Sequence, residues 1–327
     1  MKRAFLLAVQ AVLAAAVLAT AGAATAQTKL KWAHVYETGE AYHKWAVWAG
    51  DEIKKRTSGR YEVQVFPASS LGKETDINQG LTLGTVDIIY TGQAFAARTY
   101  PPLAIGGAPF MFRDFKHWKA YADSPVLQEL MDAYFKKGGN KPVTVTYYGV
   151  RHTTANKAIM KPEDMAGLKL RVPDAPLYVM YPKIVGANAT PIAFAEVYLA
   201  LQNKTVDAQE NPLPTIEAKK FYEVQSHINL TGHITEMLLT IVSGQTWGKL
   251  SDADKRIFET VLKEAAARAT NDIVAAETAL VDDFATKYKK TVVKSDRAAF
   301  AAVFQKFHLG PDATWDKALY ERVQALK

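Results

Sequence analysis

The stretch that decides the fold class reads LKWAHVY (residues 30–36), YHKWAVWAGDEIKKR (42–56), YEVQVF (61–66), DINQGLTL (76–83) and VDIIYT (86–91). The first, third and fifth segments carry strand signals, and the two segments between them carry helix signals. Such alternation is typical of βαβ units around a largely parallel sheet. The sequence therefore predicts an α/β fold.

A second α/β unit is predicted further along the chain. In the predicted strand 168–172, apolar residues share one face while Lys169 and Arg171 point to the other. Pro173 ends this strand, because it cannot donate to a ladder. A helix with its apolar stripe at 194–201 follows, and then a short strand that ends at Gln209.

Two segments are predicted to link these units. Residues 143–148 are rich in β-branched and aromatic residues, which predicts a strand that crosses from one domain into the next. Between Gly248 and Gly310 there is no glycine or proline, and apolar residues keep near-helical spacing. With Ser251 as N-cap, we expect a helix over about 251–289. At 1.5 Å per residue it is roughly 55 Å long, enough to brace both domains.

The N-terminus has the pattern of a secretory signal peptide. Lys2 and Arg3 precede an apolar stretch, and Ala24-Thr25-Ala26 forms a small-residue cleavage site. We expect residues 1–26 to be removed after Ala26 and the mature protein to be exported to the periplasm. No later stretch reaches the roughly 18 uninterrupted apolar residues of a membrane span, so a soluble mature protein is expected.

Composition and missing motifs exclude several functions. The chain has no cysteine, which excludes thiol redox chemistry and cysteine metal sites. Its 40 basic and 33 acidic residues are interspersed, so nucleic-acid binding has little support. No common nucleotide-binding, hydrolase or zinc-protease motif occurs, and the seven histidines show no metal-ligand spacing. We expect no metal, no cofactor and no enzymatic activity.

Three polar residues at predicted strand ends indicate an anion site. Arg171 lies at the carboxyl end of its strand, the rim where open α/β sheets usually bind ligands. Arg151 and Asn211 also follow predicted strands, at similar topological positions. A guanidinium fork matches a carboxylate with two charge-assisted hydrogen bonds. A lone arginine at such a place is commonly a solvated surface charge, but the three together predict a carboxylate site.

Six further residues are candidates for the same crevice: Glu74, His34, Tyr36, Tyr90, Gln93 and Phe194. Glu74, at a predicted helix start, either complements the helix dipole or accepts hydrogen bonds from ligand hydroxyls. His34 is either a buried structural histidine or, with Tyr36, part of the crevice rim. Tyr90 and Gln93 have the same two interpretations, and Phe194 is either a core residue or a wall of the site.

Five segments form a series along the chain: FPASSLG (66–72), YGVRHTTAN (148–156), MAGLKLRVP (165–173), TPIAFAEVYLALQ (190–202) and VDAQENP (206–212). Together they resemble the DctP-type solute-binding proteins of tripartite ATP-independent periplasmic (TRAP) transporters. The resemblance covers essentially the whole mature chain. It implies a two-domain, periplasmic-binding-protein-like fold with a ligand cleft between the domains. It also implies delivery of the ligand to a small and a large membrane subunit.

On this basis we expect the first domain to comprise residues 27–148 with about 237–276, and the second to comprise 149–236 with about 300–327. The long predicted helix spans both.

The resemblance also implies roles for single residues. Arg171 matches the arginine that pairs with the ligand carboxylate, Arg151 a second anion contact, and Asn211 the asparagine of the QENP segment. Glu74 matches an acidic residue that often meets ligand hydroxyls, and Phe194 a pocket wall. Relatives that bind sialic acid carry a glutamate at the position of Gly92 and an arginine at that of Phe95, which argues against sialic acid here.

We therefore expect a monomeric binding protein that captures a small organic acid, hydroxylated or sugar-derived, and passes it to the membrane subunits. Two alternatives remain at this point: a periplasmic sensor that presents its ligand to a membrane receptor, and an exported enzyme that uses Glu74 or His34 as a base. The identity of the acid and any metal-ion assistance in its binding are left open by the sequence.

Overall fold

The structure, a computed structural model, describes residues 27–327. The predicted signal peptide, residues 1–26, lies outside the described residues. The strands are β1 (Thr28–Ala33), β2 (Tyr61–Phe66), β3 (Ile88–Gly92), β4 (Lys141–Ala155), β5 (Lys169–Val172), β6 (Asn188–Pro191), β7 (Ala208–Pro212), β8 (His227–Val242) and β9 (Thr291–Val293).

The α-helices are α2 (Ala41–Arg56), α3 (Glu74–Leu83), α4 (Gln93–Ala96), α5 (Phe115–Ala122), α6 (Pro125–Gly138), α7 (Pro176–Ile184), α8 (Val197–Gln202), α9 (Leu213–Ala218), α10 (Phe221–Val224), α11 (Gly244–Lys249), α12 (Asp252–Thr286), α13 (Arg297–His308) and α14 (Lys317–Gln324). Short 3₁₀ helices are η1 (Pro101–Gly107), η2 (Pro162–Met165) and η3 (Phe194–Glu196).

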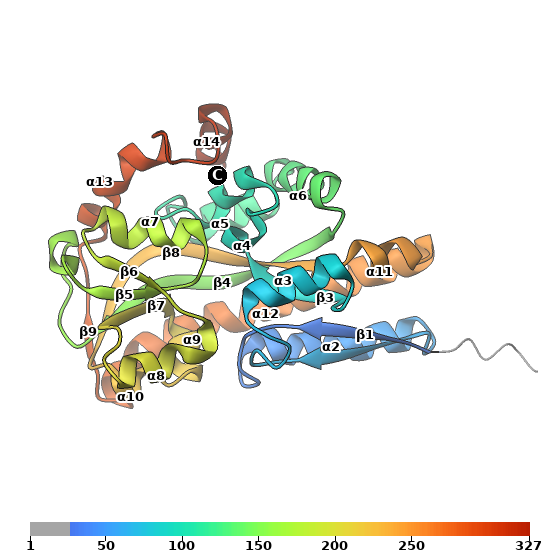
Figure 1. Ribbon diagram of the computed structural model, residues 1–327, viewed down its shortest axis with the longest axis horizontal. Helices are drawn as coiled ribbons and strands as arrows, with labels where there is room; N and C mark the ends of the chain where they lie inside the picture. The colour runs from blue at the N-terminus through green and yellow to red at the C-terminus, as the bar shows by residue number, and fades with distance from the viewer. Residues whose placement is uncertain (1–26) are drawn as a thin grey trace, which may run out of the picture.

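One mixed sheet runs through the described part of the chain in the order β2-β1-β3-β8-β4-β7-β5-β6, with β9 beside β8 (Figure 1). In one half the strands β1, β2 and β3 are parallel to one another, and in the other half β5, β6 and β7 are parallel to one another. The long strands β4 and β8 pair antiparallel between the halves. Each long strand extends into both halves, since β3 pairs with residues 238–242 of β8 and β7 with residues 151–155 of β4.

The predicted α/β fold is confirmed. The expected strands at 30–36, 61–66 and 86–91 are β1, β2 and β3, and the helices between them are α2 and α3. The predicted crossing strand is β4, which is longer than the predicted 143–148. The sequence analysis did not identify β8, the antiparallel partner of β4 along its length.

The predicted long helix is α12, with 35 residues and therefore about 52 Å of length. Its N-cap is Ser251, whose Oγ accepts a hydrogen bond from the Asp254 N–H at 3.1 Å. The helix contacts α2 in the first half of the molecule and α9 in the second. No helix within residues 27–327 has both the length and the apolar character required to cross a membrane.

A bulge in β4 is held by α12. The register between β4 and β8 shifts between Tyr147 and Gly149, and Gly149 has φ +122°. Glu277 of α12 accepts hydrogen bonds from the Val150 N–H at 2.6 Å and from the Tyr147 hydroxyl at 2.8 Å. Because Glu277 is desolvated, its pKa is raised to about 7. The point where β4 passes between the halves is thus tied to the long helix.

The C-terminal segment contacts parts of the molecule beyond the domain to which the sequence analysis assigned it. Residues 300–327 were expected with the second domain. Arg322 pairs with Glu129 of α6 at 2.8 Å, and Arg113 donates to the Gln324 carbonyl at 3.0 Å. The last helix, α14, therefore contacts residues of the predicted first domain.

We predict that Gly149→Ala lowers the free energy of unfolding by about 2 to 4 kcal/mol. An added Cβ would stand 2.5 Å from Glu277 Oε1 and 2.8 Å from Pro212 Cβ. Gly139→Ala is the matched control, because Gly139 also has a positive φ but has no atom within 4 Å of the built Cβ. Urea unfolding measures both variants, and equal losses would refute the steric argument.

We predict that Glu277→Gln makes stability less dependent on pH. A carboxyl with a raised folded-state pKa stabilises the fold below its unfolded pKa, and this contribution is lost as the pH rises through about 7. The wild type should therefore lose stability relative to Glu277→Gln between pH 5 and pH 8, a window that follows from these two pKa values. Urea unfolding at both pH values tests this, and parallel profiles would contradict it.

Candidate functional site

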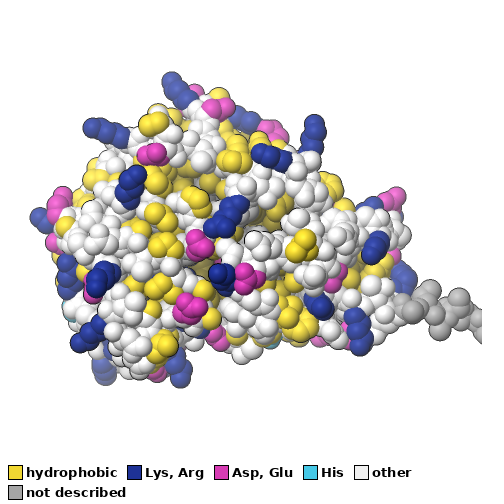
Figure 2. Space-filling view, in the orientation of Figure 1, with side chains coloured by type: hydrophobic (Ala, Val, Ile, Leu, Met, Phe, Trp, Pro, Cys, Tyr) yellow, Lys and Arg dark blue, Asp and Glu magenta, His cyan; other side chains and the backbone are white. Residues whose placement is uncertain are grey.

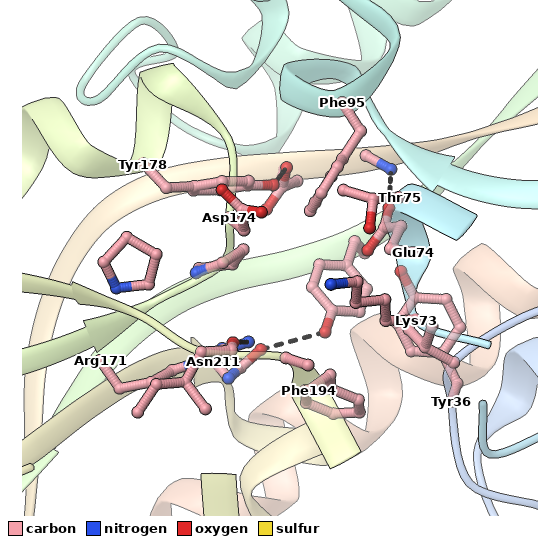
Figure 3. A pocket seen from close by; sticks show the side chains of 18 of the residues that line it. Tyr36, Lys73, Glu74, Thr75, Phe95, Arg171, Asp174, Tyr178, Phe194 and Asn211 are labelled. Carbon is pink, nitrogen blue, oxygen red and sulfur yellow. Dashed lines mark hydrogen bonds between the residues drawn. The ribbon is translucent and has the colours of Figure 1, made fainter. Parts of the chain in front are cut away.

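A cavity of about 250 Å³ lies between the two halves, above the crossing strands. Its lining comes from both halves and includes Tyr36, Glu74, Phe95, Arg171, Phe194 and Asn211. On the face in Figure 2, acidic and basic side chains gather around a central hollow. Figure 3 shows Arg171 on the opposite side of the cavity from Glu74 and Phe95.

Arg171 is a buried cation without an anionic partner among the described residues. Strand β5 places it at the cavity, and its residue exposure is 2%. Nε and Nη2 donate to the Ile192 carbonyl at 2.9 and 2.7 Å, while the guanidinium lies 5.9 Å from the Phe194 ring centroid. Nη1 has no hydrogen-bond partner within residues 27–327. Burial lowers the pKa of Arg171 to about 10, so the side chain remains charged at neutral pH.

Arg151 is also buried, but its charge is compensated within the protein. Its Nη1 lies 2.8 Å from Glu236 Oε2, and its Nη2 lies 2.7 Å from Glu210 Oε1. Burial by itself would lower the pKa of Arg151, but Glu210 and Glu236 raise it well above the ordinary value. His233 Nε2 also meets Glu210 at 3.0 Å. Arg151 therefore lines the cavity with most of its hydrogen-bonding capacity already used.

Glu74 has both properties that the sequence analysis considered. It is the first residue of α3, where a carboxylate complements the helix dipole, and it lines the cavity. Its Oε1 accepts hydrogen bonds from the Gly92 N–H at 2.8 Å and from Thr91 Oγ1 at 2.9 Å. Its pKa is raised to about 7 by burial. Oε2 accepts no hydrogen bond from residues 27–327.

The remaining walls are aromatic and amide groups. The Tyr148 hydroxyl donates to Asn211 Oδ1 at 3.1 Å, and Asn211 Nδ2 donates to Gln209 Oε1 at 2.7 Å. Tyr36 packs 5.3 Å from Tyr148 and 6.3 Å from Phe194 between ring centroids. The cavity therefore combines apolar ring surface with a small number of oriented polar groups, as small-molecule sites usually do.

Three of the predicted site residues, His34, Tyr90 and Gln93, are not among the residues that line this cavity. His34 packs behind Tyr36 with ring centroids 5.9 Å apart, and burial lowers its pKa to about 3. The ring centroids of Tyr90 and His34 are 6.0 Å apart. Gln93 is buried, and its Nε2 donates a hydrogen bond to the Met237 sulfur at 3.0 Å. His34 follows β1, Tyr90 lies within β3 and Gln93 follows β3, but none of these three side chains lines the cavity.

Tyr148, Tyr178 and Glu236 are among the lining residues that the sequence analysis did not propose. Tyr148 is the first residue of the YGVRHTTAN segment, and Tyr178 lies on α7. Glu236 lies on the unidentified strand β8, where a single acidic residue stands among apolar ones. That isolated charge was the available signal, since a buried acid is rare unless it is paired.

Among residues 27–327, no group of three or more metal-ligating side chains could hold a metal ion.

The chain belongs to the bacterial extracellular solute-binding proteins of family 7, whose model matches residues 32–310. These are the DctP-type proteins of TRAP transporters, so the resemblance is confirmed. Proteins of this family bind solutes for transport and are not enzymes. The two-domain architecture expected from the resemblance is that of the matching crystal structures.

Particular relatives show what this family binds. A solute-binding protein of Roseobacter denitrificans is 34% identical over 89% of each chain. Its crystal structure with bound L-galactonate has a TM-score of 0.85 at 30% identity and covers 91% of this chain and 99% of that one. The crystal structure of a TRAP solute-binding protein of Polaromonas, bound to D-erythronate, has a TM-score of 0.86 at 33% identity. The match covers 92% of this chain and 99% of that one. The sialic acid-binding periplasmic protein of Vibrio cholerae is 36% identical over 82% of this chain and 83% of its own.

We predict that replacing the two buried arginines affects stability differently. Arg151→Met leaves Glu210 and Glu236 buried without their cation, so the free energy of unfolding should fall by about 3 to 5 kcal/mol. Arg171→Met removes a charge that has no carboxylate partner, so the ligand-free protein should be unchanged or more stable. Urea unfolding of protein freed of ligand by unfolding and refolding measures both. An Arg171→Met loss as large as that of Arg151→Met would contradict the distinction.

Proposed function

We propose that this protein captures a small hydroxylated organic acid in the periplasm and delivers it to the membrane subunits of a TRAP transporter. The ligand carboxylate pairs with Arg171. The single observation that carries this proposal is the buried Arg171 guanidinium, whose Nη1 is unpartnered at the cavity. A buried charge is costly unless it is paired and hydrogen-bonded, and a carboxylate supplies both the charge and the acceptors.

Contacts between the halves support closure around the ligand. Lys219 Nζ, from the second half, lies 2.7 Å from Glu37 Oε1 of the first. Arg98 Nη2, from the first half, donates to the Asp174 carbonyl of the second at 2.6 Å. Closure removes water from the cavity, which strengthens the attraction between Arg171 and an anion. A ligand that contacts both halves therefore shifts the protein toward the closed state.

The opposite side of the cavity suits hydroxyl groups. Glu74 offers a free carboxylate oxygen there, and Asn211 and the tyrosine rings can bind the carbon chain of a polyol acid. The relatives that bind D-erythronate and L-galactonate support this class of ligand. At the two positions that argue against sialic acid, Gly92 and Phe95 line the cavity with no charged group.

The ligand is found first by a thermal-shift screen with aldonates and other hydroxy acids, because binding to the native state raises the melting temperature. The best acid is then measured by calorimetry. If no organic acid stabilises the wild type, the proposal is wrong.

We predict that Arg171→Ala weakens binding of that acid by about a hundredfold or more, since a buried carboxylate loses its charge partner. Arg171→Lys should also bind weakly, because an ammonium cannot reproduce the bidentate fork. Arg56→Ala is the control, because Arg56 pairs with Glu264 outside the cavity. Near-normal affinity of Arg171→Ala would remove Arg171 as the anchor.

A further inference from the structure

The two sides of the cavity differ in charge. One side carries Arg171, and the other carries Glu74 and Glu236, of which Glu236 is paired with Arg151. The other charged lining residues, Lys73, Asp174 and Glu196, are exposed. On the basis of the proposed function, we infer that the site selects monocarboxylates over dicarboxylates. The geometry assigns this selectivity to Glu236, which occupies the position where a second ligand carboxylate would otherwise find a cation.

Glu236 is a buried cavity residue with both oxygens engaged. Its residue exposure is 1%. Oε2 lies 2.8 Å from Arg151 Nη1, and Oε1 accepts a hydrogen bond from the Tyr178 hydroxyl. The side chain therefore covers the cavity-facing edge of Arg151 and is held there from β4 and α7. Without Glu236, Arg151 would present a free Nη1 to the ligand.

The two glutamates converge on one point of the wall. A Cβ built on Gly92 would stand 3.2 Å from Glu236 Oε1 and 3.9 Å from Glu74 Oε1. Glu236 is also among the charges that raise the pKa of Glu74, after the larger effect of burial. The wall beside Gly92 is thus an acidic surface, suited to donors such as hydroxyl groups and opposed to a second carboxylate.

The count of buried charges leads to the same conclusion. Arg151 and Arg171 carry two positive charges, and Glu210 and Glu236 carry two negative charges, so these four residues balance before the acidic Glu74 is counted. A bound monocarboxylate adds one negative charge directly at Arg171. A dicarboxylate adds a second one beside Glu74 and Glu236, in a setting where electrostatic repulsion is weakly screened. Replacing a terminal hydroxyl of the ligand by a carboxylate should therefore reduce binding.

The test uses acids that differ only at the terminus opposite the first carboxylate. D-erythronate is paired with meso-tartrate, and L-galactonate with galactarate. For the pair whose aldonate binds wild-type protein, calorimetry should show the dicarboxylate at least about tenfold weaker. Glu236→Gln should narrow that ratio by about tenfold, because the amide removes one negative charge and weakens the hold on Arg151.

Controls separate charge selectivity from general damage. Glu277→Gln also neutralises a buried glutamate, but Glu277 lies outside the cavity, so the ratio should stay at the wild-type value. If Glu236→Gln does not fold, as judged by circular dichroism, Glu74→Gln replaces it and should also narrow the ratio.

The outcomes distinguish the two proposals. Equal affinity of wild type for both members of a pair, or a ratio unchanged in the folded Glu236→Gln variant, overturns the selectivity inference and leaves the proposed function standing. A wild-type protein that binds neither these acids nor any other organic acid in the screen overturns both.

Discussion

The ion pairs of Arg151 with Glu210 and Glu236 are the interaction on which the site depends. They join β4 to β7 and to β8 at the point where the two long strands pass from one half of the molecule to the other. All three side chains are buried, so each charge is tolerable only because the others are present. The network forms part of the cavity wall, and it uses the donors of Arg151, while Nη1 of Arg171 remains available.

Two arginines of the same chemistry therefore have different roles. Arg151 is satisfied by the protein, and its removal would leave carboxylates uncompensated. Arg171 is satisfied only in part, by a single carbonyl oxygen and an aromatic ring. An anion that enters the cavity can pair with this partly satisfied guanidinium. The pairing gives the protein affinity for its ligand without any reaction being catalysed. The acidic groups opposite Arg171 then limit the charge that the rest of the ligand can carry.

Much of the fold was predictable because its signals are local. The period-two pattern at 61–66, the helical spacing along α12 and the cap at Ser251 each depend on neighbours in the chain. The strand β8 was not predicted, although polar residues recur at every second position over 227–235. The alternation is lost at 237–239, where consecutive apolar residues are all buried. Its single acid, Glu236, therefore escaped as well.

The sequence by itself determined the α/β class, the long helix, the family, and Arg171, Glu74 and Asn211 as cavity residues. These follow from local patterns and from motifs carried on short segments. Only the tertiary structure decided that Arg151 is paired while Arg171 is not, and that His34, Tyr90 and Gln93 lie behind the cavity wall. Pairing and side-chain direction depend on residues distant in sequence, such as Glu236 opposite Arg151, and no local pattern specifies which of them meet.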